Sequence, residues 1–262
     1  MAIQLRLTHI DTACILIELN GYNILTDPTL DRAGHWYYHG AGAFSQKIAS
    51  PALPAKGLPK VDLVLLSHHQ HQDNLDKEGT RFLASVPLAL STHAAARKFK
   101  NVRGMAAWDS IDIRTPEVKG LRITATPAQH HPWWVPGFVA GKVVGFVIEW
   151  EGQKDGVLYI SGDTVFFSGL NEVARRYKMN IGLFHVGSVQ FRYLTALGRY
   201  TMNGRDLLKA AHLLKPGKII PVHYKGWSHF KEEEATLRKT IAADAFAKDR
   251  SYFLLPGVTT MF

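Results

Sequence analysis

Short apolar runs separated by turn-forming residues recur along the chain and predict a protein rich in short strands. The clearest pair is Ala13–Leu19 and Tyr22–Thr26, joined by Asn20-Gly21, a dipeptide that favours a two-residue hairpin turn. The interval Leu30–Pro59 is rich in Gly, Ala, Pro and aromatic residues, and we expect a long loop there. Further strands are expected at Val61–Leu66, Leu88–Ser91, Leu121–Thr126, Val143–Trp150, Val157–Ile160, Ile181–Phe184 and Lys218–Val222, and Ser251–Leu255 closes the chain.

Helical patterns lie between the later strands, where apolar residues recur three and four positions apart. Helices are expected at Asp76–Leu83, Ala94–Lys100, Leu170–Tyr177, Asn203–Leu214 and Lys231–Lys248. Strands that come first and then alternate with helices predict a mixed α/β architecture, with helices layered over sheet. The pattern has no internal repeat and no long polar linker, so residues 1–262 are expected to form a single domain.

The composition is that of a globular chain, because 46% of its 262 residues are hydrophobic and 20% are charged. The single cysteine, Cys14, excludes an internal disulfide framework and a multi-cysteine zinc site. The sequence has neither a run of about 18 apolar residues nor the pattern of a secretory signal. We therefore expect a cytoplasmic protein without a membrane span.

Thirteen histidines are present, and several of them directly follow predicted strands. Val61–Leu66 leads into the run Ser-His-His-Gln-His-Gln-Asp-Asn, residues 67–74. In an extended loop, residues two apart turn to the same side, so His69, His71 and Asp73 can face one centre. Three more chelating residues directly follow later strands: His130, Asp163 and His223. Imidazoles and carboxylates bind zinc and other divalent transition metals, and strand ends in α/β folds meet at one edge, so a metal site is predicted.

These motifs resemble those of the metallo-β-lactamase superfamily, whose hallmark is His-x-His-x-Asp-His after a strand, then a single His, a single Asp and a final His after later strands. The corresponding residues occur here in that order: His69, His71 and Asp73, then His130 in ATPAQH, Asp163 in SGDT and His223 in PVHY. Leu25-Thr26-Asp27-Pro28 also resembles the branch that holds ascorbate-6-phosphate lactonase and the phospholipase D acting on N-acyl phosphatidylethanolamines. The resemblance, which covers most of the chain, implies an αββα sandwich with the metal site at one edge of its two sheets.

The chain departs from the hallmark at Asn74, which stands where the last histidine of the first motif is expected. An amide oxygen is a much weaker ligand for a transition metal than an imidazole. A second metal ion would then be held by Asp73, Asp163 and His223 alone. The number of ions, one or two, therefore stays open, with zinc favoured and manganese or iron as alternatives.

The register of the first motif has two solutions, because His68 precedes His69 and a one-residue bulge would make His68 the ligand. The His-x-His-x-Asp spacing favours His69. His130 is likewise favoured over His131, since it directly follows the Pro-Ala-Gln turn at a strand end.

The resemblance implies catalysis by a metal-activated water, because a divalent ion lowers the pKa of bound water to about 7 and polarises the scissile oxygen. Asp73 can orient that water and accept its proton. His185 and His229 also lie just after strand ends, where they could donate a proton or contact substrate. A structural hydrogen-bonding role is the alternative for each.

The leading hypothesis is a hydrolase of a small or medium anionic ester, lactone or phosphodiester, which the net charge of +9 would help to attract. A nuclease on the same fold is the second hypothesis. It would use the basic cluster Arg97, Lys98, Lys100 and Arg103, which a solvated helix face explains equally well. Because nucleases of this superfamily usually carry an added domain, a nucleic-acid partner is not expected. A metal-binding sensor without activity is the third hypothesis, the thiol dioxygenases of the same fold stay compatible with the motifs, and a homo-oligomer stays open.

Overall fold

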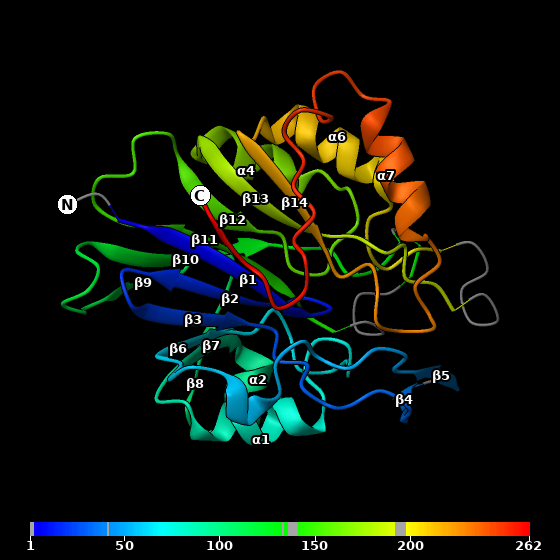
Figure 1. Cartoon of the computed structure of the whole chain (residues 1–262), viewed down its shortest axis with the longest axis horizontal. Helices are drawn as coiled ribbons and strands as arrows, with labels where there is room; N and C mark the ends of the chain where they lie inside the picture. The colour runs from blue at the N-terminus through cyan, green and yellow to red at the C-terminus, as the bar shows by residue number, and fades with distance from the viewer. Residues whose placement is uncertain (1–2, 41, 133, 136–140, 192–197) are drawn as a thin grey trace.

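The computed structural model describes residues 3–40, 42–132, 134–135, 141–191 and 198–262, which form two facing β-sheets with helices outside each (Figure 1). The first sheet has the order β15 (Thr259–Met261), β1 (Leu5–Asp11), β2 (Cys14–Leu19), β3 (Tyr22–Thr26), β6 (Leu63–Leu65), β7 (Ala89–Thr92) and β8 (Val102–Met105). The second has the order β14 (Lys218–Val222), β13 (Met179–His185), β12 (Val157–Ile160), β11 (Val144–Glu149), β10 (Leu121–Pro127) and β9 (Ser110–Ile113). The expected αββα sandwich is confirmed.

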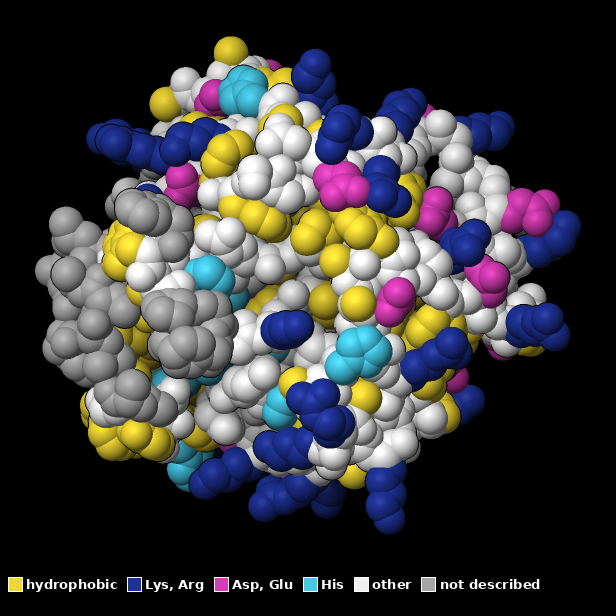
Figure 2. All heavy atoms as spheres, turned by 180° about the vertical axis from the view of Figure 1, so that it is seen from behind, with side chains coloured by type: hydrophobic (Ala, Val, Ile, Leu, Met, Phe, Trp, Pro, Cys, Tyr) yellow, Lys and Arg dark blue, Asp and Glu magenta, His cyan; other side chains and the backbone are white. Residues whose placement is uncertain are grey.

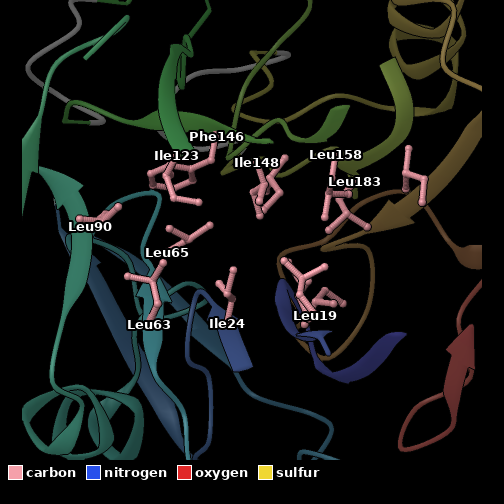
Figure 3. Packing of buried hydrophobic residues seen from close by; sticks show 14 of the residues in the cluster. Leu19, Ile24, Leu63, Leu65, Leu90, Ile123, Phe146, Ile148, Leu158 and Leu183 are labelled. Atoms are coloured by element: carbon pink, nitrogen blue, oxygen red, sulfur yellow. The ribbon is translucent and has the colours of Figure 1, made fainter. Parts of the chain in front are cut away.

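Three apolar layers hold the sandwich together. Between the sheets, side chains such as Leu19, Ile24 and Leu65 of the first sheet face Phe146 and Leu183 of the second (Figure 3). The outer face of the second sheet packs on α4 (Gly169–Arg176), α6 (Gly204–Leu214) and α7 (Glu234–Ala242). The outer face of the first sheet is covered by α1 (Lys77–Ser85) and α2 (His93–Lys98). Burial of apolar surface on both faces of both sheets makes them rigid supports for the loops at their edges.

Local sequence signals explain why the β2–β3 hairpin and helix α6 agree with the expected elements. The hairpin β2–β3 turns at Asn20 and Gly21, whose φ angles of 50° and 95° are those of the favoured two-residue turn. Helix α6 begins after Asn203, whose side-chain oxygen accepts a hydrogen bond from the Asp206 amide at 2.9 Å. Both features agree with the expectations from sequence.

Two expectations about secondary structure are wrong. The interval Leu30–Pro59 contains a hairpin, β4 (Trp36–Gly40) and β5 (Ala43–Gln46), which projects from one end of the sandwich (Figure 1), and a short 3₁₀ helix, Ala55–Gly57. The last helix ends at Ala242 instead of Lys248, because the Asp244 carboxylate accepts the amides of Phe246 and Ala247 and folds the chain into a turn. Near the end of the chain, Ser251 forms an isolated bridge with Ile219, and β15 is the edge strand of the first sheet.

The ends of several strands lie at one edge of the sandwich. Strands β12, β13 and β14 are parallel neighbours, so the residues that follow them emerge side by side. Across the sandwich, β6 is parallel to β3 and β7 and ends at the same edge. Within the described part of the chain, no helix is long and apolar enough to cross a membrane.

Candidate metal centre

Three imidazoles converge in the loop between β6 and α1 and at the end of β10. His71 Nδ1 lies 3.0 Å from His68 Nε2 and 3.0 Å from His130 Nε2. The three ligand atoms all lie within 4.8 Å of one another, which is the spacing of donors around a single ion. We call His68, His71 and His130 the imidazole group.

Hydrogen bonds behind two of these rings decide which nitrogen faces the centre. His130 Nδ1 is 2.8 Å from the Tyr200 carbonyl oxygen, which can only accept, so Nδ1 carries the proton and Nε2 presents its lone pair. His68 Nδ1 is 3.0 Å from Ser67 Oγ, and its Nε2 likewise points to the centre. Such supporting bonds are typical of histidines that bind metals.

A second group, named here the carboxylate group, consists of Asp73, Asp163 and His223, whose ligand atoms also lie within 4.8 Å of one another. His223 Nε2 is 3.3 Å from Asp73 Oδ2 and 3.6 Å from Asp163 Oδ2. The groups adjoin, since His130 Nε2 is 3.8 Å from Asp163 Oδ2. His223 Nδ1 points to the Val186 carbonyl oxygen at 3.3 Å, which leaves Nε2 for the centre.

Backbone geometry places the carboxylate group. Gly162, at φ 61°, directly precedes Asp163, and a Cβ there would lie 2.6 Å from the Val144 carbonyl oxygen, so only glycine fits. His223 itself has φ 60°, and its amide donates to the Thr12 carbonyl at 2.8 Å. A non-glycine residue in this conformation carries strain of the kind that is found at functional sites.

Buried polar atoms without a partner mark this region as fit for a cation. Within the described residues, Asp73 Oδ1, Asp163 Oδ2 and His223 Nε2 are buried and make no hydrogen bond. An unpartnered buried polar atom costs free energy, and a divalent ion at this place would satisfy all three. The donor set of imidazole nitrogens and carboxylate oxygens suits zinc, manganese or iron.

Burial determines the direction of the pKa shifts in the imidazole group, whereas neighbouring charges determine it for Asp163 and His223 of the carboxylate group. Burial lowers the pKa of His68, His71 and His130, to about 4 for His130, so these rings are neutral at physiological pH. Burial also disfavours an ionised Asp163, but the nearby His223 charge and the hydrogen bond from His185 outweigh it and hold the pKa below its ordinary value. Burial lowers the pKa of His223, but the carboxylates of Asp163 and Asp73 outweigh this effect and raise the pKa to about 9.

In the first motif, His68 rather than the favoured His69 lies beside His71 and His130. The side chain of His69 lies outside both groups, half-buried, with its ring 5.9 Å from that of Phe99. His68 lies where His69 was expected, and the residue before it is held by Asp27, whose Oδ1 accepts the Ser67 amide at 2.7 Å. The geometry therefore agrees with the alternative register, in which His68 and His71 are the candidate ligands.

The choice of His130 over His131 agrees with the geometry, because His131 Nδ1 instead contacts the Pro132 carbonyl oxygen at 3.0 Å. Asn74 is fully buried, and its Nδ2 lies 3.5 Å from Ser67 Oγ. Its Oδ1 makes no hydrogen bond within the described part of the chain. The residue at the hallmark's last histidine position thus adds no imidazole to either group.

His185 lies against Asp163 of the carboxylate group. Its Nδ1 is 2.9 Å from Asp163 Oδ1, its Nε2 is 3.9 Å from Asp27 Oδ2, and its ring stacks on His223. The ring is buried with both nitrogens facing carboxylates of the chain, a geometry that fits the hydrogen-bonding alternative. Asp27 is also buried, and burial raises its pKa to about 8.

His229 connects the carboxylate group with a cavity. Its Nε2 is 2.9 Å from Asp73 Oδ2, and its ring stacks on Phe191. It lines a cavity of about 570 Å³, a volume suited to a small molecule. The other lining residues are Trp36, Phe44, Gln190, Phe191, Ser228 and Lys231. We call this hollow the aromatic cavity.

Two residues near the centre were missed from the sequence, and both come from the interval expected to be a loop. The His39 ring on β4 lies 5.1 Å from that of His229 and 6.3 Å from that of His71. The fully buried Lys47 pairs with Asp11 at 2.5 Å and with Asp76 at 3.0 Å, which ties the end of β1 to the start of α1. The alternation of Trp36–Gly40 and Ala43–Gln46 was the available signal for this hairpin.

Known proteins share both the sequence pattern and the fold. A UPF0173 metal-dependent hydrolase from Methanosarcina mazei is 26% identical over 248 residues, covering 94% of this chain and 94% of that protein. A possible metal-dependent hydrolase from Veillonella parvula has a similar structure, with a TM-score of 0.82 at 21% identity over 99% of this chain and 100% of that one. An isothiocyanate hydrolase from Delia radicum gut bacteria has a TM-score of 0.79 at 23% identity, covering 98% of both chains.

The family described as the beta-lactamase superfamily domain matches residues 22–224, which include both ligand groups. The match covers most of the chain, and the two-sheet fold agrees with it. The chain belongs to the beta-lactamase superfamily.

Proposed function

We propose that this chain is a metal-dependent hydrolase that cleaves a small or medium anionic ester, lactone or phosphodiester. The observation that supports this most strongly is the pair of adjoining ligand groups, in which the hydrogen bonds of His68, His130 and His223 leave a nitrogen free toward the centre. The imidazole group would hold one divalent ion and the carboxylate group a second. Zinc is favoured, and manganese and iron are the alternatives.

Bound divalent ions supply a water of lowered pKa and polarise the substrate's oxygen. Asp73 is the proton acceptor in this proposal, because its Oδ2 is held by His229 while its Oδ1 is left without a partner among the described residues. Attack of the water oxygen on carbon or phosphorus forms one bond, and the bond to the leaving oxygen breaks. His229, which contacts Asp73 and lines the aromatic cavity, can pass the proton taken up by Asp73 on to that leaving oxygen.

His185 and Asp27 act as positioning residues in this proposal. His185 fixes one oxygen of Asp163 at 2.9 Å, so that the other oxygen faces the centre. Asp27 holds the Ser67 amide and thereby the turn that directs His68 inward. The segment around Asp27 is the one that resembles the lactonase and phospholipase branch, and we propose substrates of those bond types first.

Metal analysis joined to a hydrolysis screen tests this function. The screen should contain chromogenic carboxyl esters, lactones and phosphodiesters, with a neutral isothiocyanate for comparison because an isothiocyanate hydrolase shares the fold. We expect about one to two divalent ions per chain and turnover of an anionic substrate. Asp73→Asn should abolish turnover, whereas Asp155→Asn, at an exposed position in the β11–β12 turn, should not.

Two results would contradict the proposal. A purified protein that binds no transition metal and gains no thermal stability from added metal would have no functional centre of this kind. A protein that binds metal tightly and hydrolyses nothing in the screen would support the metal-binding sensor instead.

A further inference from the structure

A second cavity, with a volume of about 800 Å³, adjoins the imidazole group on the side of α2. This volume lies within the range of small-molecule sites. The residues of its wall that bear on the argument are His93, Arg97, His130, His131 and Lys142. We call this hollow the basic cavity.

The wall of the basic cavity carries positive charge without a balancing carboxylate. Arg97 and Lys142 both line it, and none of its lining residues is Asp or Glu. Across the described ranges, neither side chain forms an ion pair with an acidic residue. Figure 2 shows Lys and Arg side chains gathered with histidines over the part of the molecule that contains α2. An unbalanced cationic wall in a concave site attracts anions.

The basic cavity is joined to the metal centre through His130, which lies on its wall. The Nε2 atom of this residue is 3.0 Å from His71 Nδ1, so the wall of the basic cavity includes one residue of the imidazole group. The aromatic cavity, in contrast, reaches the centre through His229 and carries the exposed rings of Trp36 and Phe44. The two cavities therefore offer a substrate different chemistry.

We propose that the basic cavity binds an oxyanion of the substrate and that Arg97 and Lys142 determine this specificity. The inference rests on the proposed hydrolase function and narrows its substrate class to molecules with a carboxylate or phosphate group next to the scissile bond. Arg97 can contact two oxygens of such a group with its planar guanidinium, and Lys142 adds a point charge.

Binding of simple anions tests the site without turnover. Inorganic phosphate and acetate should raise the melting temperature of the metal-loaded protein, and the stronger of the two identifies the preferred oxyanion. Arg97→Met should weaken this binding by about 10–100-fold, and Arg97→Lys should restore part of it. Arg103→Met is the control, because Arg103 is a basic residue of the neighbouring strand β8 that does not line the cavity.

Kinetics on a matched pair of esters, one anionic and one neutral, separates specificity from folding. Arg97→Met should raise KM for the anionic ester by about 10–100-fold and leave its kcat and both constants for the neutral ester near wild type. Equal losses on both esters, or anion binding that is unchanged in Arg97→Met, would overturn the inference. If the wild type binds phosphate through Arg97 and hydrolyses no ester, the hydrolase function fails while the anion site stands.

Discussion

The imidazole group and the carboxylate group adjoin each other, yet they hold protons in opposite ways. In the imidazole group burial keeps all three rings neutral, so their lone pairs are available at physiological pH. In the carboxylate group the pKa of His223 is raised to about 9 by two acidic neighbours, so a cation arriving there must first displace a proton. Two neighbouring sets of candidate metal ligands can therefore differ in affinity because protons compete with the metal ion in one set and not in the other.

The largest effect is expected when one residue of the imidazole group is removed. His68→Ala should abolish tight metal binding and lower activity by more than about 100-fold, because even the loss of a supporting residue costs 10–100-fold. His69→Ala should keep metal content and activity at about the wild-type level, because its ring lies against Phe99. Metal analysis and turnover of both variants check this, and the reverse ranking would show that the loop has the register expected from its spacing.

The pH dependence of metal binding should differ between the groups. The first, tighter binding step should change little between pH 7 and 9, since the imidazole group has no proton to release there. The second step should strengthen as pH rises, by at most about 100-fold over those two units, because the proton on His223 competes below its pKa of about 9.

Calorimetric titration in buffers of different ionisation enthalpy counts the protons released at each step. The expected result at pH 7 is a proton released with the second ion and none with the first. Equal proton release at both steps would remove the distinction between the groups.

A smaller effect is expected at Asn74, beside the carboxylate group. Asn74→His should add an imidazole and tighten the second step by about tenfold, the lower end of the change that one contact at a metal site produces. The first step should stay unchanged, and a melting curve should show that the larger side chain is tolerated. A second step with unaltered affinity would place residue 74 out of reach of the ion.

Local signals predicted much of the fold, whereas contacts distant in sequence decided the rest. The turn at Asn20-Gly21 and the cap at Asn203 are fixed by neighbouring residues, so the sequence was sufficient for them. Strand β1 was missed, because it lies between β2 and β15 and depends on a partner from the other end of the chain. The last helix is shorter than the expected Lys231–Lys248, because the turn at Asp244 competes with helical hydrogen bonds.

In the candidate site, too, local sequence signals predicted some residues, whereas contacts distant in sequence decided others. Strand ends that meet at one edge made His71, His130, Asp163 and His223 predictable as neighbours. The choice between His68 and His69 was not, because it depends on the Asp27 carboxylate, which lies forty residues from the Ser67 amide that it holds. The position of His39 could not be predicted either, because the β4–β5 hairpin, which is distant in sequence, brings its ring next to that of His229.

We propose that His68, His71 and His130 hold the tightest-bound ion. A crystal structure of the zinc-loaded protein, with an anomalous difference map, tests it most directly. We expect the strongest peak about 2.0–2.1 Å from His68 Nε2, His71 Nδ1 and His130 Nε2, and a weaker peak among Asp73, Asp163 and His223. A strongest peak bound by His69, or one held by the carboxylate group with the imidazole group empty, would contradict the account.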